Sequence, residues 1–267
     1  MALLLLLPAL ALVGLMMIAC PRPRPLPPCR RYAHRGLHDL AAGIPENSLA
    51  AFRRARAAGY GAELDVHLTA DGRLAVLHDS DLRRLCGVEG TAEAMTAAAL
   101  TRLPILGTGE TVPLLEDVLD VYAGGPPLLL ELKAAGGNAA ALAEAVCRAL
   151  EGRRGTFLLQ SFHPLTLRTV RKLRPDLPRG QLSKSFLRDG AVHAVPAFFL
   201  TNLLLNWLSR PDFIAYRFAD RRNPCLRLVR RLFGTALFCW TLTSPEEIAA
   251  ADAEGCTAIF EGLEPAP

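Results

Sequence analysis

The sequence has little of what marks disordered, fibrous or nucleic-acid-binding chains. Aromatic residues make up 6% and charged residues 21% of its 267 residues, whereas 51% are hydrophobic. That hydrophobic share is enough for a core of normal size, which argues against a disordered chain and a coiled coil. The formal net charge is only +4, and the basic residues are not interleaved with aromatic ones. We therefore expect no nucleic-acid partner.

The cysteines lack the spacing of a metal site or a disulfide framework. There are seven, an odd number, and no two form a C-x-x-C pair. Zinc sites and small disulfide-rich folds both use such regular spacing. The sequence therefore predicts neither.

The beginning of the chain lacks charge. The run from Ala2 to Cys20 is apolar, and at 1.5 Å per residue such a run can cross the ~30 Å hydrocarbon core of a bilayer. A secretory signal would begin with Lys or Arg, which is absent here. Four arginines follow the run instead: Arg22, Arg24, Arg30 and Arg31. The positive-inside rule then predicts a single transmembrane anchor over residues 1–20, with the rest of the chain in the cytoplasm.

The end of this run allows a second interpretation. Met17-Ile18-Ala19-Cys20 loosely resembles a lipobox. Cys20 would then be the lipidated residue of an exported lipoprotein. After it, five prolines between Pro21 and Pro28 predict an extended linker over residues 21–29.

The remaining residues, 30–267, are predicted to form one domain of alternating strands and helices. Nine runs have strand character: 32–36, 62–68, 74–78, 128–133, 157–162, 181–183, 213–216, 236–242 and 258–260. Four runs have clear helical character: 48–58, 139–150, 165–173 and 245–253. This alternation predicts an α/β fold with a parallel sheet closed as a (β/α)8 TIM barrel, the alternative being a doubly wound open sheet.

Two stretches do not fit a simple barrel count. Asp71-Gly72 lies between the second and third strand candidates and indicates a hairpin, so one of the nine strands is expected outside the barrel. The apolar stretch 191–208 contains Asn202 and Asn206, and its helical spacing predicts a buried or interfacial helix rather than a second membrane span.

Acidic residues interrupt strands that should be apolar. Glu63 and Asp65 are two residues apart, so both point to the same face of their strand. Two neighbouring buried carboxylates repel each other and lose hydration, which a bound cation relieves. Glu131 and Lys133 repeat the spacing with one acid and one base, which alone could be a structural salt bridge.

Further charged residues follow other strands. His34 and Arg35 end the first strand candidate, and His78 ends the third. Barrel enzymes gather their catalytic groups at these carboxyl-terminal strand ends. We therefore expect these residues to share a site with the acidic ones.

The residue types in this set suit phosphate ester cleavage. Carboxylate oxygens from Glu63, Asp65 and Glu131 favour a hard divalent cation, Mg²⁺ or Ca²⁺. Arg35 and Lys133 supply positive charge for an anion. Two histidines can donate and accept protons near neutral pH.

Six ordered motifs resemble the glycerophosphodiester phosphodiesterase family. They are Ala33-His34-Arg35-Gly36, Pro45-Glu46-Asn47-Ser48, Glu63-Leu64-Asp65-Val66, Leu68-Thr69-x-Asp71-Gly72, His78-Asp79 and Glu131-Leu132-Lys133. The likeness is strong over 32–133 and continues through Ser161-Phe162-His163-Pro164 and Trp240-Thr241.

The resemblance implies a TIM barrel that hydrolyses glycerophosphodiesters to glycerol 3-phosphate and an alcohol with one divalent ion. It implies that His34 and His78 form the acid–base pair, and that Arg35 and Lys133 bind phosphate. The implied metal ligands are Glu63, Asp65 and Glu131. Glu46 is implied to support the metal or the substrate glycerol.

The chain departs from the family pattern in three places. The last strand is followed by Glu261-Gly262 rather than by a Thr-Asp-Tyr-Pro-like motif, the loop 39–44 is insertion-like, and residues 82–111 follow the His-Asp motif and could cover part of the mouth. These differences are expected to affect substrate choice more than chemistry. Two other functions stay open: lysophospholipase D-type cleavage of lysophospholipids at the membrane, and an inactive binding barrel. The alcohol headgroup and the oligomeric state do not follow from the sequence.

Overall fold

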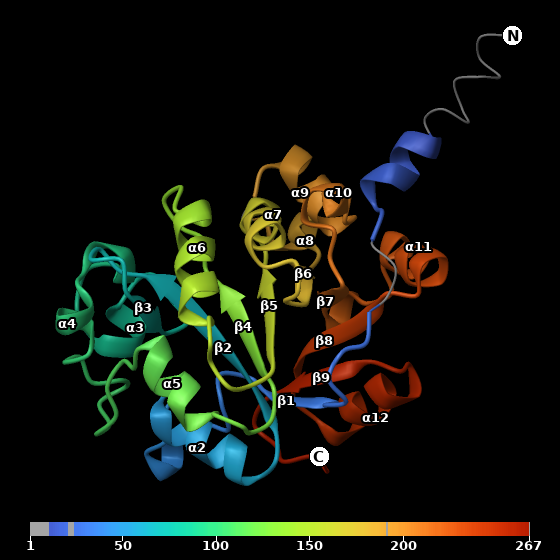
Figure 1. Cartoon of the computed structure of the whole chain (residues 1–267). Coiled ribbons are helices and arrows are strands. Elements are labelled where there is room, and N and C mark those ends of the chain that lie inside the picture. Colours follow the sequence, from blue (N-terminus) through green and yellow to red (C-terminus); the bar gives the residue numbers. More distant parts are fainter. Residues whose placement is uncertain (1–10, 21–23, 191, 267) are drawn as a thin grey trace, which may run out of the picture.

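The computed structural model describes residues 11–20, 24–190 and 192–266. Eight parallel strands close into a barrel in the order β1-β9-β8-β7-β6-β5-β4-β2, with β1 and β2 paired to complete the ring (Figure 1). The TIM-barrel prediction is therefore confirmed, and the open-sheet alternative is wrong. The strands, including β3 outside the ring, are β1 Arg31–Ala33, β2 Gly61–Leu68, β3 Leu74–Val76, β4 Leu128–Leu132, β5 Phe157–Ser161, β6 Arg179–Ser183, β7 Phe213–Arg217, β8 Ala236–Leu242 and β9 Thr257–Phe260.

The extra strand is the predicted hairpin. β3 pairs antiparallel with β2 through Val66 opposite Val76, and the turn contains Gly72 at φ 76°. Glycine adopts this left-handed conformation without steric cost. β3 pairs only with β2 among the named strands and lies outside the closed ring.

Helices cover the outside of the barrel. They are α2 Leu49–Ala57, α3 Arg83–Cys86, α4 Ala97–Leu100, α5 Leu115–Val121, α6 Ala139–Ala149, α7 Pro164–Leu173, α8 Phe186–Asp189, α9 Ala194–Thr201, α10 Asn206–Ser209, α11 Pro224–Phe233 and α12 Pro245–Ala253. The four predicted helical runs are confirmed as α2, α6, α7 and α12. Ser48 caps α2 by accepting a hydrogen bond from the backbone N–H of Ala51, as an N-cap serine does.

The apolar core has two layers. Inside the ring, side chains such as Leu129, Leu158 and Phe213 fill the barrel interior. Between ring and helices, a larger cluster includes Leu64 and Val66, which alternate along β2 with the inward carboxylates. The alternation positions the charged residues because every second side chain of β2 must enter the interior.

The segment between β3 and α5 forms a small separate unit. It contains α3, α4 and a 3-10 turn over Ala92–Ala94. Leu77, Leu85 and Ile105 are among the residues of its own apolar cluster. The predicted insertion is therefore folded, and it lies beside the strand ends that carry His78.

Of the described amino-terminal residues, Ile18 and Cys20 are buried against the domain, whereas most residues of 11–17 are exposed and project from it (Figure 1). Residues 11–17 are helical, and within the described parts of the chain no helix is long and apolar enough to cross a membrane. Residues 1–10 of the predicted anchor lie outside the described residues, so the anchor stays a prediction. Arg24 forms an ion pair with Asp212, Nε to Oδ1 at 2.9 Å, and Leu26 packs against the interior cluster. The predicted linker, 21–29, thus contacts the amino-terminal end of the barrel where it is described.

Candidate active site

The first site residues follow β1. This strand ends at Ala33, earlier than predicted, because Arg35 and Gly36 adopt left-handed φ angles of 55° and 79°. A β-carbon on Gly36 would lie 2.8 Å from that of Ala51, so only glycine fits there. The turn aims the backbone N–H of Arg35 at Glu63 Oε2, 3.2 Å away, and brings His34 to the mouth of the barrel. Left-handed non-glycine residues cost energy and cluster at functional sites.

The next strands supply three buried carboxylates. Glu63 and Asp65 point inward from β2, and Glu131 points inward from β4, where it is paired with Asp65 in the sheet register. One oxygen of each lies within 4.8 Å of the others. The three predicted metal ligands therefore come together at one point.

Positive charge only partly balances these carboxylates. Lys133 Nζ lies 2.7 Å from Glu131 Oε1 and 3.0 Å from Asp65 Oδ1, and Arg35 Nε lies 3.7 Å from Asp65 Oδ2. Burial alone would lower the pKa of Lys133, but Asp65 and Glu131 outweigh burial and raise that pKa. Burial opposes ionisation of Asp65, yet Lys133 and further cationic groups lower its pKa.

Glu63 is the uncompensated member of the cluster. Burial, followed by the charges of Asp65 and Glu131, raises the pKa of Glu63 well above its usual value. Its oxygens accept only long hydrogen bonds, 3.2 Å from the Arg35 N–H and 3.4 Å from Gln160 Nε2. A site with three convergent carboxylates and too little positive charge fits a divalent cation with oxygen ligands.

Each predicted catalytic histidine is oriented by a carboxylate. His34 Nδ1 lies 2.5 Å from Glu261 Oε2, and His78 Nδ1 lies 2.6 Å from Asp79 Oδ1. The hydrogen bond at Nδ1 leaves Nε2 of each ring for the substrate, and Nε2 of His34 lies 4.0 Å from Glu63 Oε2. Burial lowers the pKa of His78, which favours the neutral form that can accept a proton.

A third histidine holds the loop of His78 in place. His67 continues the inward row of β2 and is buried. Its Nδ1 lies 2.6 Å from Glu93 Oε1 and its Nε2 lies 3.2 Å from the carbonyl oxygen of His78. Glu93 also accepts a hydrogen bond of 2.6 Å from Ser80. His67 is therefore a positioning residue that fixes the backbone beside His78.

Glu46 lies outside the carboxylate cluster. Its Oε1 lies 2.9 Å from Arg35 Nη1 and 2.8 Å from Arg84 Nη2. Burial would raise the pKa of Glu46, but these two arginines outweigh burial and lower it. The structure thus brings Glu46 to Arg35 rather than to the implied metal ligands, and its role toward metal or glycerol stays a prediction.

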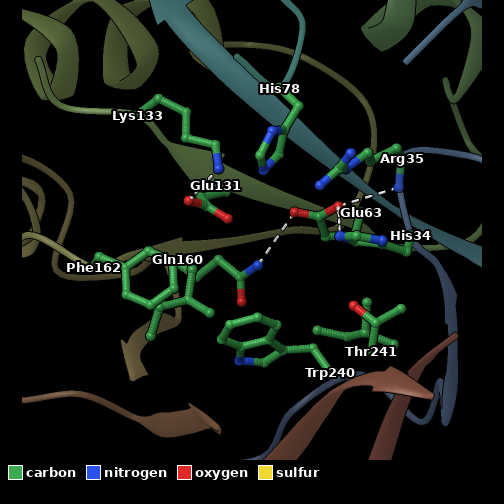
Figure 2. Close-up of a pocket in the computed structure, with 12 residues that line it drawn as sticks. His34, Arg35, Glu63, His78, Glu131, Lys133, Gln160, Phe162, Trp240 and Thr241 are labelled. Atoms are coloured by element: carbon green, nitrogen blue, oxygen red, sulfur yellow. Dashed lines mark hydrogen bonds and ion pairs between the residues drawn. The ribbon is translucent and has the colours of Figure 1, made fainter. Parts of the chain in front are cut away.

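Six of the eight predicted site residues, all but Glu46 and Asp65, line a cavity of about 120 Å³. Figure 2 shows the charged groups of His34, Arg35, Glu63, His78, Glu131 and Lys133 on one side and Phe162, Trp240 and Thr241 on the other. Phe162 and Trp240 meet edge to face with ring centroids 5.7 Å apart. The cavity therefore has one wall that can bind an anion and one that is largely apolar.

Besides His67, four supporting residues were not predicted from the sequence: Asn47, Asp79, Gln160 and Glu261. Asn47 donates to Asp65 Oδ2 at 2.9 Å, and Gln160 is paired in register with Glu131. Asn47 and Asp79 stand inside the recognised motifs, and Gln160 is a polar residue in an otherwise apolar strand, so signals for them existed. Glu261 had only its departure from the family pattern as a signal, since it is 227 positions from His34.

Comparison with known proteins agrees with this geometry. Residues 34–261 match the glycerophosphoryl diester phosphodiesterase family. A glycerophosphodiester phosphodiesterase of Bacillus altitudinis is 33% identical over 179 residues, which is 62% of this chain and 72% of that protein. One from Caldanaerobacter subterraneus is 32% identical over 56% of this chain and 65% of its own length.

Solved structures share the fold. A putative glycerophosphoryl diester phosphodiesterase from Silicibacter pomeroyi has a TM-score of 0.68 and 26% identity, with 93% of each chain covered. An Oleispira antarctica phosphodiesterase, solved with its product sn-glycerol-3-phosphate, has a TM-score of 0.71 and 22% identity, covering 87% of this chain and 92% of that one. On the family match over most of its length, this chain is an enzyme and belongs to the glycerophosphoryl diester phosphodiesterase family.

Proposed function

We propose that this chain hydrolyses water-soluble glycerophosphodiesters to glycerol 3-phosphate and an alcohol, with His34 and His78 as the proton-transfer pair. The observation that carries the proposal is the single cavity in which both histidines face Glu63, Glu131, Arg35 and Lys133. Family membership supports the same reaction class.

The implied divalent cation fits the residues present. Glu63, Asp65 and Glu131 would hold it, because their oxygens converge and burial with the neighbouring carboxylates raises the pKa of Glu63 well above its usual value. When bound, Mg²⁺ or Ca²⁺ would polarise the phosphoryl oxygens and offset charge in the transition state. Arg35 and Lys133 bind the remaining phosphate charge from the same wall.

The histidines divide the proton transfers. One imidazole accepts the proton of the nucleophile as the new P–O bond forms, and the other donates a proton to the alkoxide as the old P–O bond breaks. The carboxylates of Glu261 and Asp79 hold the two rings by their Nδ1 atoms. The nucleophile is water or the glycerol hydroxyl of the substrate, the second route passing through a cyclic phosphate.

A coupled assay tests this reaction. Glycerol 3-phosphate release is measured over a panel of glycerophosphodiesters and lysophospholipids, with Mg²⁺, with Ca²⁺ and with excess chelator. We expect turnover of glycerophosphodiesters that chelator abolishes and that exceeds the turnover of lysophospholipids. Full turnover in chelator would remove the metal from the proposal.

We further propose that the apolar amino-terminal run tethers the enzyme to the cytoplasmic face of a membrane. The arginines that follow the run support this orientation. Burial of Cys20 weighs against the lipoprotein alternative: its Sγ lies 3.4 Å from Asn206 Nδ2, and burial raises its pKa to about 11. Protease added outside intact cells should leave the domain uncut, whereas a lipidated Cys20 found by mass spectrometry would replace the tether with the lipoprotein.

A further inference from the structure

We propose that a second surface of this chain, beside the amino-terminal run, binds the headgroups of an anionic lipid bilayer. The surface comprises the outer faces of α7, α9, α10 and α11 and is called the basic–apolar face below. In Figure 1 these helices lie in the upper right part of the molecule near residues 11–20, whereas α3 and α4 lie on the left.

The apolar part of this face is formed by α9 and α10. No residue of α9 is charged, and Val195 and Phe198 are 70% and 50% exposed. Trp207 of α10 is also 50% exposed. Large neighbouring apolar side chains in contact with water mark interaction surfaces, and tryptophan is enriched where a protein meets the membrane interface.

The basic part borders these side chains. α10 packs against α7, which carries Arg168 and Arg171, and Arg210 follows α10 directly. The sequence has no acidic residue in 152–175 or 190–211. Burial lowers the pKa of Arg171, and nearby Arg210 and Arg168 lower it further, as expected for cations that lack a counter-charge. The face therefore has unused positive charge beside exposed apolar groups.

α11 extends the same face. It buries Leu226 and Val229 and turns arginines and leucines outward. The side chain of Asn223, at its start, donates to the carbonyl oxygen of Thr201 at the end of α9, 3.5 Å away. No acidic residue occurs in 221–245. The outward leucines, Leu228 and Leu232, are 44% and 51% exposed beside the arginines, so this side of α11 has the same mixture of apolar and basic groups.

A bilayer is the occupant that accounts for both parts of the face. Anionic headgroups complement its arginines, and apolar side chains can enter the region below them. The face is also continuous with the apolar amino-terminal run, because Asn206 of α10 donates to the carbonyl oxygen of Ile18 at 3.3 Å. Leu12 and Val13 beyond this contact are exposed. The run and the face therefore point to one lipid surface.

Tryptophan quenching in the full-length protein tests the proposal. The protein is bound to vesicles of phosphatidylcholine, with or without phosphatidylglycerol, that carry brominated acyl chains. The Trp207 signal is obtained by subtracting the emission of a Trp207→Phe variant. We expect quenching of Trp207 that requires phosphatidylglycerol and that Phe198→Ser weakens.

Charge variants show whether the face itself binds. The double variant Arg168→Gln, Arg171→Gln should lower the ratio of docked to undocked protein about 30-fold. Each basic residue near an anionic surface contributes about 1 kcal/mol to binding, and the variant removes two of them. Arg102→Gln, an exposed arginine beside α4, is the matched control and should leave quenching unchanged. Turnover of a soluble glycerophosphodiester should be the same in all variants, so the result is independent of the proposed reaction.

Three outcomes would overturn the proposal. The first is an unquenched Trp207 with phosphatidylglycerol vesicles, whether or not the protein sediments with them. The second is quenching of Trp207 that is the same with and without phosphatidylglycerol and the same in the arginine variants as in the wild type. The third is a lipid-free dimer that shields Trp207, which would identify a second copy of the chain as the occupant.

Discussion

The two ends of the barrel differ in how completely their buried carboxylates are paired with cations. At the amino-terminal end, one carboxylate is surrounded by donors: Asp212 accepts from the Arg179 N–H at 2.9 Å and pairs with the side chains of Arg179 and Arg24 at 3.4 and 2.9 Å. At the carboxyl-terminal end, three carboxylates share two close cations, Lys133 and Arg35, whose ion pairs go to Asp65 and Glu131.

The different pairing of the carboxylates assigns them different roles: Asp212 stabilises the fold, and the cluster at the carboxyl-terminal end serves the proposed reaction. A buried carboxylate that is fully paired holds its neighbours in place, and its removal leaves an uncompensated buried charge. In a cluster of carboxylates with too few neighbouring cations, the negative charges repel one another, and a bound metal cation reduces this repulsion. Substitutions at the amino-terminal end should therefore lower the free energy of unfolding, whereas substitutions at the carboxyl-terminal end should lower kcat or kcat/KM.

The largest effect is expected from the histidines at the mouth. His34→Ala and His78→Ala should each lower kcat by ~10² or more, because each removes a proton-transfer group. Both variants should remain folded, because both rings border the cavity, although His34→Ala also removes the stabilising hydrogen bond with Glu261. A variant whose kcat stays near the wild-type value would take that histidine out of the mechanism.

The second largest effect is expected from the ion cluster of Asp212, Arg179 and Arg24 at the amino-terminal end of the barrel. Asp212→Ala should lower the free energy of unfolding by about 3 kcal/mol, because it leaves Arg179 buried without its partner. Denaturant titration measures this loss, and kcat of the remaining folded enzyme should be unchanged. Asp120→Ala, which removes an exposed partner of Arg153, is the control and should cost less than about 1 kcal/mol. Equal losses in the two variants would contradict the assigned role of Asp212.

Arg35→Lys tests how the phosphate is bound. A planar guanidinium can hold two phosphate oxygens, whereas an ammonium offers a point charge. We expect kcat/KM to fall by about 10 to 100-fold, since the shorter reach also loosens the contact with Glu46. If kcat/KM stays within about twofold, Arg35 is structural and the phosphate is held elsewhere.

Glu261→Gln tests the positioning of His34. The hydrogen bond with His34 lowers the pKa of Glu261 to about 2, so the carboxylate stays ionised at every pH usual for assays. The variant should lower kcat about tenfold, which is less than the ~10²-fold or larger effect of removing a proton-transfer group itself, and Glu261→Asp should restore part of the loss.

The lowered pKa of Glu261 also predicts how the stability of the protein depends on pH. A carboxylate whose pKa is lowered in the folded state stabilises the protein above its unfolded-state pKa, and this contribution disappears as pH falls toward the folded value. The stability difference between wild type and Glu261→Gln should therefore be full at neutral pH and shrink from about pH 4.5 downward. A difference that grows in acid would contradict the hydrogen bond.

The smallest effect is a gain in stability. In excess chelator, Glu63→Gln should raise the free energy of unfolding by about 1 kcal/mol, because the amide keeps the shape and removes repulsion from Asp65 and Glu131. With metal present the order should reverse, since the variant loses a ligand. A variant less stable than wild type in chelator would show that the carboxylates do not repel one another.

Local patterns predicted most of the fold and the centre of the site. Alternation along β2 placed Glu63 and Asp65 on one face, and Asp71-Gly72 indicated the hairpin, because both depend on neighbours in sequence. The extent of β1 was not predicted, since its end depends on the left-handed turn at Arg35 and its contact with Ala51.

Long-range contacts account for what the sequence did not predict. Glu46 belongs to a recognised motif, but Arg84, 38 positions away, turns it from the carboxylate cluster. Gln160 and Glu261 gain their roles only when the ring of strands brings them to Glu63 and His34. Sequence patterns predict which face a side chain occupies, but a distant partner decides which atom it contacts.

Closure of the ring also sets when the enzyme can become active during its synthesis. β1 pairs with β9, and His34 meets Glu261 only across that seam. A nascent chain acquires all three metal-ligand candidates and both histidines within its first 131 residues, long before the ribosome adds the residue that orients His34. Chains released early would therefore lack the carboxylate that holds His34, and under the proposed mechanism hydrolysis would begin only once the last strand has joined the first.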